Sequence, residues 1–251
     1  WLLHGTGAST HSWRDLMPEL ARNYRVFAPD LPGHGFTGHP PGSQLSLRGM
    51  AMLVARLIDT VGSPPDIVVG HSAGVAITVR MVLDDAVHPD SVVSLAGALM
   101  PMGGQNSNLM SLAAKMLAVN PLIPRIFAWR SRDQSVVQEL LDRTGSVIDE
   151  EGLRCYSALA QSPAHAKGAL TMMANWNLRH MAQDLRRFTL PLLLVTGEKD
   201  KMIPARDTAL ILELVPTARP APLAGLGHLA HEEAPARVAG LIREFAAESE
   251  N

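Results

Sequence analysis

Short apolar runs alternate with segments of helical spacing along the first hundred residues. The runs Trp1–Leu3, Ile67–Val69 and Val92–Leu95 are each short enough for a buried strand. Between Ser46 and Gly62, apolar residues recur every three to four positions, which predicts a helix with the serine as its N-cap and the glycine at its end. This alternation predicts an α/β fold, with a mostly parallel, doubly wound sheet covered by helices on both faces.

Further strands are expected on either side of a long region that has no strand signal. Residues 24–28 are apolar enough for one more early strand, and Leu192–Val195 begins a second series of strands and helices. The last strand, Arg219–Leu223, contains two prolines, so we expect it at an edge of the sheet. Pro235 is expected to begin a terminal helix.

The region without strand signals predicts a helical insertion in one domain. We expect the first part of the core over residues 1–100, a helical cap over 101–187 and the second part of the core over 188–251. Seven of the twelve methionines lie between Met100 and Met181, which is typical either of a roomy hydrophobic pocket or of the cap's own core. Met172 and Trp176 are the residues that we expect to face a ligand.

Residues 70–74, Gly-His-Ser-Ala-Gly, stand between an expected strand and an expected helix. A Gly-x-Ser-x-Gly in that setting is typical of the nucleophile elbow of an α/β-hydrolase. The serine occupies a strained turn, and only small residues two before and two after it let strand and helix approach closely. Ser72 is therefore the predicted nucleophile, and a simple glycine-rich turn is the alternative.

A serine hydroxyl needs a base to take its proton and an acid to orient that base. In this fold the chain order is serine, acid, histidine. Asp200 follows a strand in a loop at its carboxyl end, and it is the predicted acid, with Glu198 as the alternative in the same loop. His228 follows a glycine-rich turn and is the predicted base, whereas His231 is expected in the helix that follows.

The oxyanion of a tetrahedral intermediate needs two amide donors. Ala73 is expected to supply one, and the loop after the first strand the other, with Thr6 preferred and Gly7 next. This loop is no phosphate loop, because no Gly-Lys-Ser/Thr follows it. His4 is interpreted as a hydrogen-bonding residue of the loop rather than a second base. His4 and Gly7 are also weaker candidates for the substrate pocket.

Two other motifs mimic cofactor or metal sites. Residues 33–38 fit a dinucleotide fingerprint, but the prolines directly after them forbid the helix that the fingerprint requires, so we expect a turn. His228, His231 and Glu232 differ from zinc-protease spacing, because His228 precedes the helix. We therefore expect neither a cofactor nor a metal.

Composition excludes several other functions. The net charge is −2 over 251 residues, so there is no basic footprint for nucleic acid, and no apolar run reaches the length of a transmembrane segment. The single cysteine, Cys155, forms no internal disulfide, which is typical of a reducing compartment or of indifference to the redox state, and a cytoplasmic location is expected. Trp1 begins what resembles the third strand of the fold, so we expect the usual upstream strands, and any targeting segment, to lie outside this sequence.

Five segments resemble one branch of the α/β-hydrolase superfamily, the BchO-type hydrolases described as magnesium-chelatase accessory proteins of bacteriochlorophyll biosynthesis. They are His4-Gly-Thr-Gly-Ala-Ser-Thr-His-Ser-Trp13, Ala28-Pro-Asp-Leu-Pro-Gly-His-Gly35, Asn120-Pro-Leu-Ile-Pro-Arg-Ile-Phe-Ala-Trp129, Met172-Met-Ala-Asn-Trp176 and Gly225-Leu-Gly-His-Leu-Ala-His-Glu-Glu233. The similarity covers essentially the whole chain. It implies a place in chlorophyllide and bacteriochlorophyll synthesis of a phototrophic bacterium, with magnesium chelatase or a tetrapyrrole intermediate as a partner. It does not imply a substrate.

The residues together predict a serine hydrolase that cleaves an ester-type bond of a small hydrophobic substrate through an acyl-enzyme. Ser72 attacks, His228 relays the proton, and Asp200 orients His228. Amide and thioester cleavage, carbon–carbon hydrolysis and perhydrolysis use the same triad and stay open. So does a non-catalytic accessory protein that binds a tetrapyrrole or the chelatase.

Overall fold

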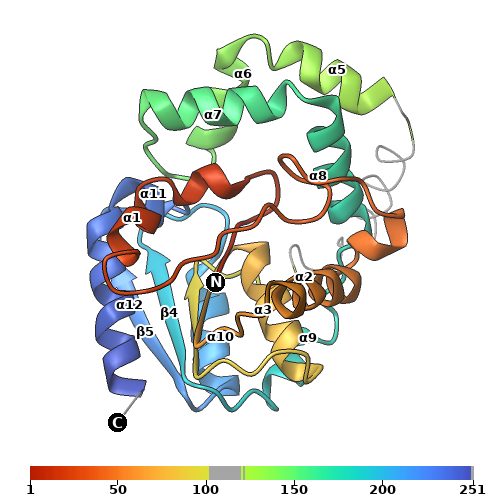
Figure 1. Ribbon diagram of the computed structural model, residues 1–251. Helices are drawn as coiled ribbons and strands as arrows, with labels where there is room; N and C mark the ends of the chain where they lie inside the picture. The colour runs from red at the N-terminus through yellow and green to blue at the C-terminus, as the bar shows by residue number, and fades with distance from the viewer. Residues whose placement is uncertain (102–119, 121, 250–251) are drawn as a thin grey trace.

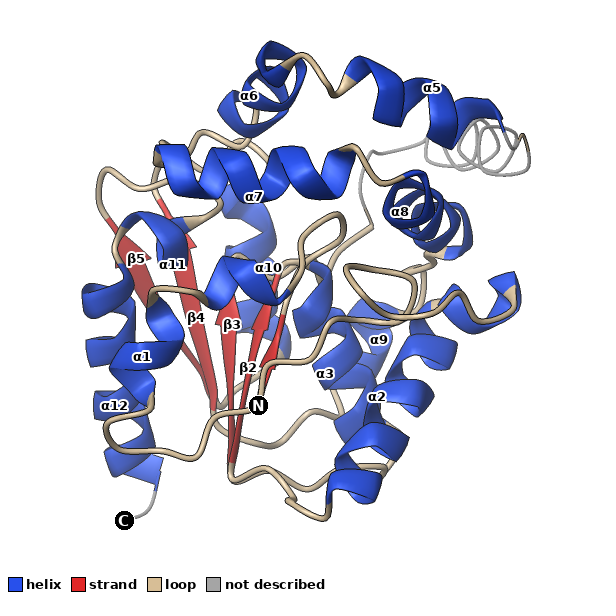
Figure 2. Ribbon diagram, turned by 45° about the horizontal axis from the view of Figure 1, so that its top comes forward, coloured by secondary structure: helices blue, strands red, loops and turns tan. Residues whose placement is uncertain are grey.

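A computed structural model describes residues 1–101, 120 and 122–249 (Figure 1). Within these residues, parallel strands form one sheet in the order β1-β2-β3-β4-β5, and Figure 2 shows the arrows side by side between helices. The strands are β1 Leu2–Leu3, β2 Ile67–His71, β3 Ser91–Leu95, β4 Leu192–Gly197 and β5 Ala218–Leu223. The predicted parallel α/β sheet is confirmed.

The helices of the described residues lie around this sheet (Figures 1 and 2). They are α1 Leu16–Leu20, α2 Leu47–Val61, α3 Ala73–Leu83, α5 Leu122–Arg130, α6 Gln134–Asp142, α7 Glu150–Ala160, α8 Pro163–Asn175, α9 Met181–Leu185, α10 Ala205–Leu214, α11 Ala230–Glu233 and α12 Pro235–Ser249, with 3₁₀ helices η1 Thr10–Trp13 and η2 Gly42–Leu45. None of these helices is long and apolar enough to cross a membrane.

Alternate residues of each strand pack on opposite faces of the sheet. On β4, Leu192 and Leu194 belong to a hydrophobic cluster with side chains of α2, α3, α9 and α10. Leu193 and Val195 belong to a second cluster, with side chains of α1, α11 and α12. Because helices cover both faces, the central strands are apolar on both sides and mostly buried.

Local signals in the sequence correctly placed several boundaries. Ser46 caps α2, since its hydroxyl accepts a hydrogen bond from the amide of Gly49 (3.3 Å), and Gly62 ends the helix with a φ of 65°. β5 lies at an edge of the sheet, as expected. Its prolines, Pro220 and Pro222, are two residues apart, so both missing amides fall on the same side of the strand, where no neighbour needs them.

The expected strand over residues 24–28 is not a strand in the structure. The segment passes beside β1, where the carbonyl of Phe27 accepts a hydrogen bond from the amide of Leu2 (2.8 Å). Its side chains still alternate, with Phe27 against one hydrophobic cluster and Val26 and Ala28 against the other. β1 has only two residues, which leaves little length for a regular ladder with this segment.

Helices α5 to α8, which we call the cap helices, follow β3 and precede β4 in the chain and lie beyond the carboxyl ends of the strands (Figures 1 and 2). Residues 102–119, expected to begin the cap, lie outside the described residues. α8 meets the core so closely that a methyl group at Gly168 would overlap the carbonyl oxygen of Gly33. Direct contact between two backbones thus holds this helix against the core.

We predict that two helix glycines respond oppositely to substitution by alanine. Gly168→Ala has no room against Gly33 and should destabilise the protein by about 1–3 kcal/mol, because α8 must shift. Gly240→Ala in α12 meets nothing within 4 Å and should stabilise it by up to about 1 kcal/mol, through helix propensity alone. Urea unfolding of both variants measures the difference. Equal effects would contradict the close contact between α8 and the core.

Candidate active site

Ser72 stands at the junction between β2 and α3 with a backbone φ of 50° and ψ of −115°. A positive φ is strained for any residue with a side chain, and such strain is typical of functional turns. The structure around the turn holds it in place. The amide of Ser72 donates to the carbonyl of Leu95 (3.0 Å), and its carbonyl accepts from the amide of Ala98 (3.0 Å).

The glycines of the turn are required by the lack of space around them. A Cβ at Gly70 would lie 2.6 Å from the amide nitrogen of Val75. A Cβ at Gly74 would overlap the carbonyl oxygen of Leu3, at the end of β1. Strand, turn and helix therefore pack as closely as the Gly-x-Ser-x-Gly pattern predicts.

Asp200 and His228 lie together in the loops that follow β4 and β5. Nδ1 of His228 is 2.9 Å from Oδ2 of Asp200, and the two side chains are only 8% and 4% exposed. The other carboxylate oxygen, Oδ1, accepts hydrogen bonds from the amides of Met202 (2.7 Å) and Ile203 (3.0 Å). Backbone donors hold one oxygen of Asp200, and the other faces the imidazole.

The two alternative residues lie elsewhere. Glu198 is exposed, and its carboxylate accepts from the amide of Gly225 (3.0 Å). His231 is in α11, as expected, and its buried ring lies 4.5 Å from that of His71 and 4.7 Å from the indole of Trp13. Burial lowers the pKa of His231 to about 3, so this imidazole stays neutral.

His71 lies against His228 in the candidate site, and the sequence analysis did not identify it as a site residue. Its ring centroid is 4.8 Å from that of His228, and its Nε2 lies 3.1 Å from the carbonyl oxygen of His228. Because a carbonyl only accepts, Nε2 carries the proton. Burial holds the pKa of His71 well below its usual range. This neutral residue connects residues 224–229, called here the histidine loop, with residues 70–74, called here the serine turn. Its position next to Ser72 in the sequence is the signal that could have identified it.

The loop after β1 lies against the serine turn, as the oxyanion-hole prediction requires. A Cβ at Gly5 would lie 2.9 Å from Nδ1 of His71 and 3.1 Å from Cβ of Ser72. Thr6 follows directly and is half-buried, and its hydroxyl is 3.5 Å from the sulfur of Met172. Ala73, the other expected donor, is buried at the first position of α3.

His4 and Gly7 take part in hydrogen bonds that shape this loop. His4 is fully buried; its Nδ1 donates to the carbonyl of Gly5 (2.8 Å) and its Nε2 accepts from the amide of Leu31 (2.9 Å). Burial lowers its pKa to about 4, so the ring is neutral. The carbonyl of Gly7 accepts from Nε2 of His165 in α8 (3.1 Å). Both positions therefore support the loop, and their role in a pocket stays a prediction.

Two residues of the cap that were expected to face a ligand lie in the larger hydrophobic cluster. Met172 is fully buried there, and Trp176 is half-buried against the same cluster. Met172 packs with side chains of the sheet and of α2 and α3, so it does not belong to a core of the cap's own, and the pocket interpretation of the methionines stays a prediction. Its contact with Thr6 nevertheless places it beside the candidate oxyanion loop.

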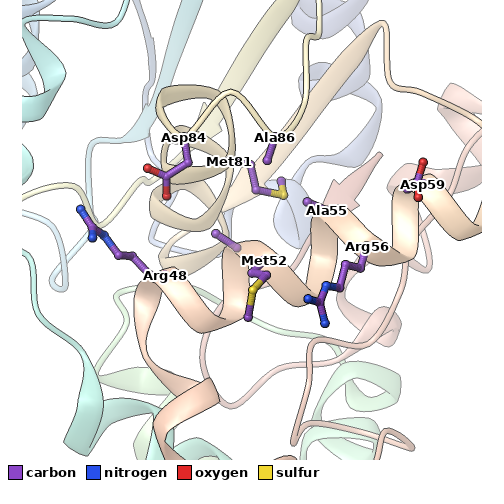
Figure 3. Close-up of a pocket in the computed structure, with 9 residues that line it drawn as sticks. Arg48, Met52, Ala55, Arg56, Asp59, Met81, Asp84 and Ala86 are labelled. Atoms are coloured by element: carbon purple, nitrogen blue, oxygen red, sulfur yellow. The ribbon is translucent and has the colours of Figure 1, made fainter.

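Two other regions of the described residues contain none of the predicted triad residues. Residues 33–38 form turns and no helix, as expected. A groove of about 490 Å³ between α2 and α3 is lined by Met52 and Met81 with charged residues around them (Figure 3). It lies at the end of α3 remote from Ser72, and it contains neither Asp200 nor His228.

Comparison with known proteins identifies the family of this chain. The model of the Alpha/beta hydrolase family matches residues 2–241. The Magnesium-chelatase 30 kDa subunit of Rhodobacter capsulatus is 38% identical over 248 residues, covering 97% of this chain and 85% of that protein. A Pimeloyl-[acyl-carrier protein] methyl ester esterase of Neisseria meningitidis is 32% identical over 213 residues, covering 82% of this chain and 77% of that protein.

Solved structures share the fold. An alpha/beta hydrolase fold protein from Burkholderia ambifaria matches with a TM-score of 0.80 at 22% identity, covering 97% of this chain and 88% of that one. A thermophilic esterase from Thermogutta terrifontis matches with a TM-score of 0.77 at 21% identity, covering 100% and 89%. The fold and the resemblance inferred from the sequence are confirmed, and this chain belongs to the alpha/beta hydrolase family.

Proposed function

We propose that this protein is a serine hydrolase that cleaves an ester-type bond through an acyl-enzyme, with Ser72 as nucleophile, His228 as base and Asp200 as orienting acid. The observation that carries the proposal is the buried 2.9 Å contact between His228 and Asp200, in loops at the carboxyl ends of the strands. Ser72 lies in a strained turn at the same edge of the sheet. These are the parts that acyl transfer needs.

The hydrogen bond between His228 and Asp200 sets the tautomer of the neutral imidazole in this mechanism. With Nδ1 donating to the carboxylate, the lone pair of the neutral imidazole is on Nε2, the nitrogen that takes the proton of Ser72 Oγ. As the serine attacks, the imidazolium that forms lies beside a carboxylate already held by two amides. His228 then returns the proton to the leaving group, and the same residues activate water for deacylation.

The oxyanion of each tetrahedral intermediate is stabilised by the amides of Ala73 and Thr6. Ala73 is the first residue of α3, where the positive end of the helix dipole adds to its N–H. Thr6 belongs to the loop that Gly5 allows to approach Ser72. The donors are set before the reaction, so little reorganisation is needed as charge develops.

Two relatives support the proposed reaction and the proposed pathway. An esterase among them supports ester cleavage. The 38% identity with a magnesium-chelatase subunit supports a role in bacteriochlorophyll synthesis, with the chelatase or a tetrapyrrole intermediate as partner. The name of that subunit also favours a second candidate, a non-catalytic accessory protein, which the first test below separates from an enzyme.

We predict that a fluorophosphonate labels Ser72 covalently, since an activated serine displaces fluoride from phosphorus. Ser72→Ala should remove all labelling and all hydrolysis of p-nitrophenyl esters. Mass spectrometry of the labelled peptide identifies the residue. Absence of labelling and hydrolysis in the wild type would favour the accessory protein, and full labelling of the alanine variant would exclude Ser72.

Asp200→Asn should keep the fold and lower kcat by roughly 10⁴-fold, because the amide favours the wrong imidazole tautomer and removes a charge. Glu198→Gln is the matched control, as its side chain bonds to Gly225 rather than to His228. Steady-state kinetics on one ester compare the two variants. If Glu198→Gln were the more damaging, the acid would be Glu198.

His228→Ala should abolish turnover, whereas His231→Ala should leave it largely intact. Between pH 5 and 9, wild type and His231→Ala should show pH–rate profiles of the same shape, because the substitution removes no group that titrates there. His231 has a pKa of about 3 and remains neutral across that range. A pH–rate profile from pH 5 to 9 measures this. An inactive His231 variant beside an active His228 variant would move the base to residue 231.

A further inference from the structure

A short loop of the cap reaches between the two loops that carry Asp200 and His228. Residues 144–147, Thr-Gly-Ser-Val, connect α6 with α7 and are called here the cap loop. The carbonyl of Thr144 accepts hydrogen bonds from two amides, those of Lys201 (3.2 Å) and His228 (3.3 Å). This one carbonyl of the cap therefore accepts hydrogen bonds from two loops at once, the histidine loop and residues 198–204, called here the acid loop.

The cap loop packs against the acid loop and the histidine loop without space for an added side chain at two glycines. Gly145 has a φ of 81°, and a side chain there would overlap the carbonyl oxygen of Lys199. A methyl group at Gly227 would in turn overlap the backbone of Gly145 and the hydroxyl of Ser146. The cap loop is thus packed backbone to backbone against both catalytic loops, rather than resting loosely above them.

Three consecutive amides of the histidine loop have defined acceptors, and two of these acceptors belong to the cap loop. The amide of Gly227 donates to Oε1 of Glu233 (2.8 Å), that of His228 to Thr144, and that of Leu229 to Oγ of Ser146 (2.8 Å). Ser146 is only 5% exposed. Hydrogen bonds on both sides of His228 thus restrain its backbone.

Glu233 joins the same two loops from α11. While Oε1 accepts from Gly227, Oε2 accepts from the amide of Val147 in the cap loop (3.1 Å). Both carboxylate oxygens are used, so a single side chain connects the histidine loop to the cap loop. The two groups that it connects are 80 residues apart in the sequence, and this contact exists only in the folded protein.

We propose that the cap loop is a positioning element of the triad, with Ser146 and Glu233 as positioning residues that hold His228 against Asp200. This inference rests on the proposed function. A catalytic base misplaced by about 1 Å costs on the order of a hundredfold in rate, so backbone restraint on both sides of His228 has a direct kinetic consequence. The docked cap therefore completes the geometry of the catalytic residues as well as covering them.

The test compares Ser146→Ala with Ser157→Ala. Both serines belong to the cap and are about equally buried, at 5% and 3% exposure, but the hydroxyl of Ser157 has no hydrogen-bond partner among the described residues. Ser146→Ala should lower kcat and the rate of fluorophosphonate labelling by about ten- to a hundredfold, with KM little changed. Ser157→Ala should leave both unchanged.

A second readout is the low-field proton NMR signal of His228 Nδ1–H, which reports its hydrogen bond to Asp200. This signal should be sharp in the wild type and in Ser157→Ala, and broadened or shifted in Ser146→Ala. Glu233→Gln is the replacement test variant if Ser146→Ala does not fold. Its amide keeps one oxygen acceptor for two backbone donors, and it should show the same loss of kcat and the same change of signal.

The outcomes separate the two proposals. A wild type that neither labels nor turns over refutes the proposed function, whereas the NMR signal still reports whether Ser146 holds His228 against Asp200. An active wild type with unchanged kcat and an unchanged signal in Ser146→Ala and Glu233→Gln would overturn the positioning role. So would losses of kcat in Ser146→Ala and Ser157→Ala that simply follow equal losses in Tm.

Discussion

The close approach of strand and helix at Ser72 is the constraint around which the candidate site is built. A positive φ costs a non-glycine residue on the order of 1–3 kcal/mol, so the turn persists only where its surroundings hold it. Here the carbonyl of Leu95 and the amide of Ala98, both from the chain around the end of β3, bond the backbone of Ser72. Gly74 lets β1 pass directly beside the start of α3.

The parallel sheet then brings the other parts to the same place. The loops after β1, β2, β4 and β5 all leave the carboxyl edge of the sheet. Residues as distant in sequence as Gly5, Ser72, Asp200 and His228 therefore lie at the same edge. The cap adds contacts from the opposite side, through His165 on the carbonyl of Gly7 and through the cap loop on the histidine loop. In the proposed mechanism, core and cap position the catalytic groups together.

Features with a local physical cause could be predicted from the sequence. The serine turn, the Ser46 cap of α2 and the edge position of β5 each follow from residues a few positions apart. The segment of residues 24–28 has strand-like alternation, but whether it forms a ladder depends on how much of β1 is beside it. That information is not local, so the expected strand was wrong.

The residues proposed to support the triad could not be predicted from local sequence patterns, for a similar reason. Ser146 stands in a Thr-Gly-Ser turn, which is common in proteins and says nothing about the amide of Leu229 that it bonds. Glu233 belongs to a segment that resembles a known branch, yet its acceptor role depends on Val147, far away in the chain. By contrast, the contact between Asp200 and His228 followed from chain order and strand ends, because the fold itself sets those positions.

The two histidines that neighbour His228 are both neutral, and this affects the electrostatics of the site. His71 and His231 both lie in the buried interior, and burial lowers their pKa values, so both rings stay neutral. Neutral neighbours matter in the proposed mechanism, because a second imidazolium about 5 Å away would oppose the charge that forms on His228. His228 differs from them in facing the carboxylate of Asp200 directly. A histidine-rich interior is therefore compatible with the proposed proton relay, since burial disfavours charge on the two neighbouring rings.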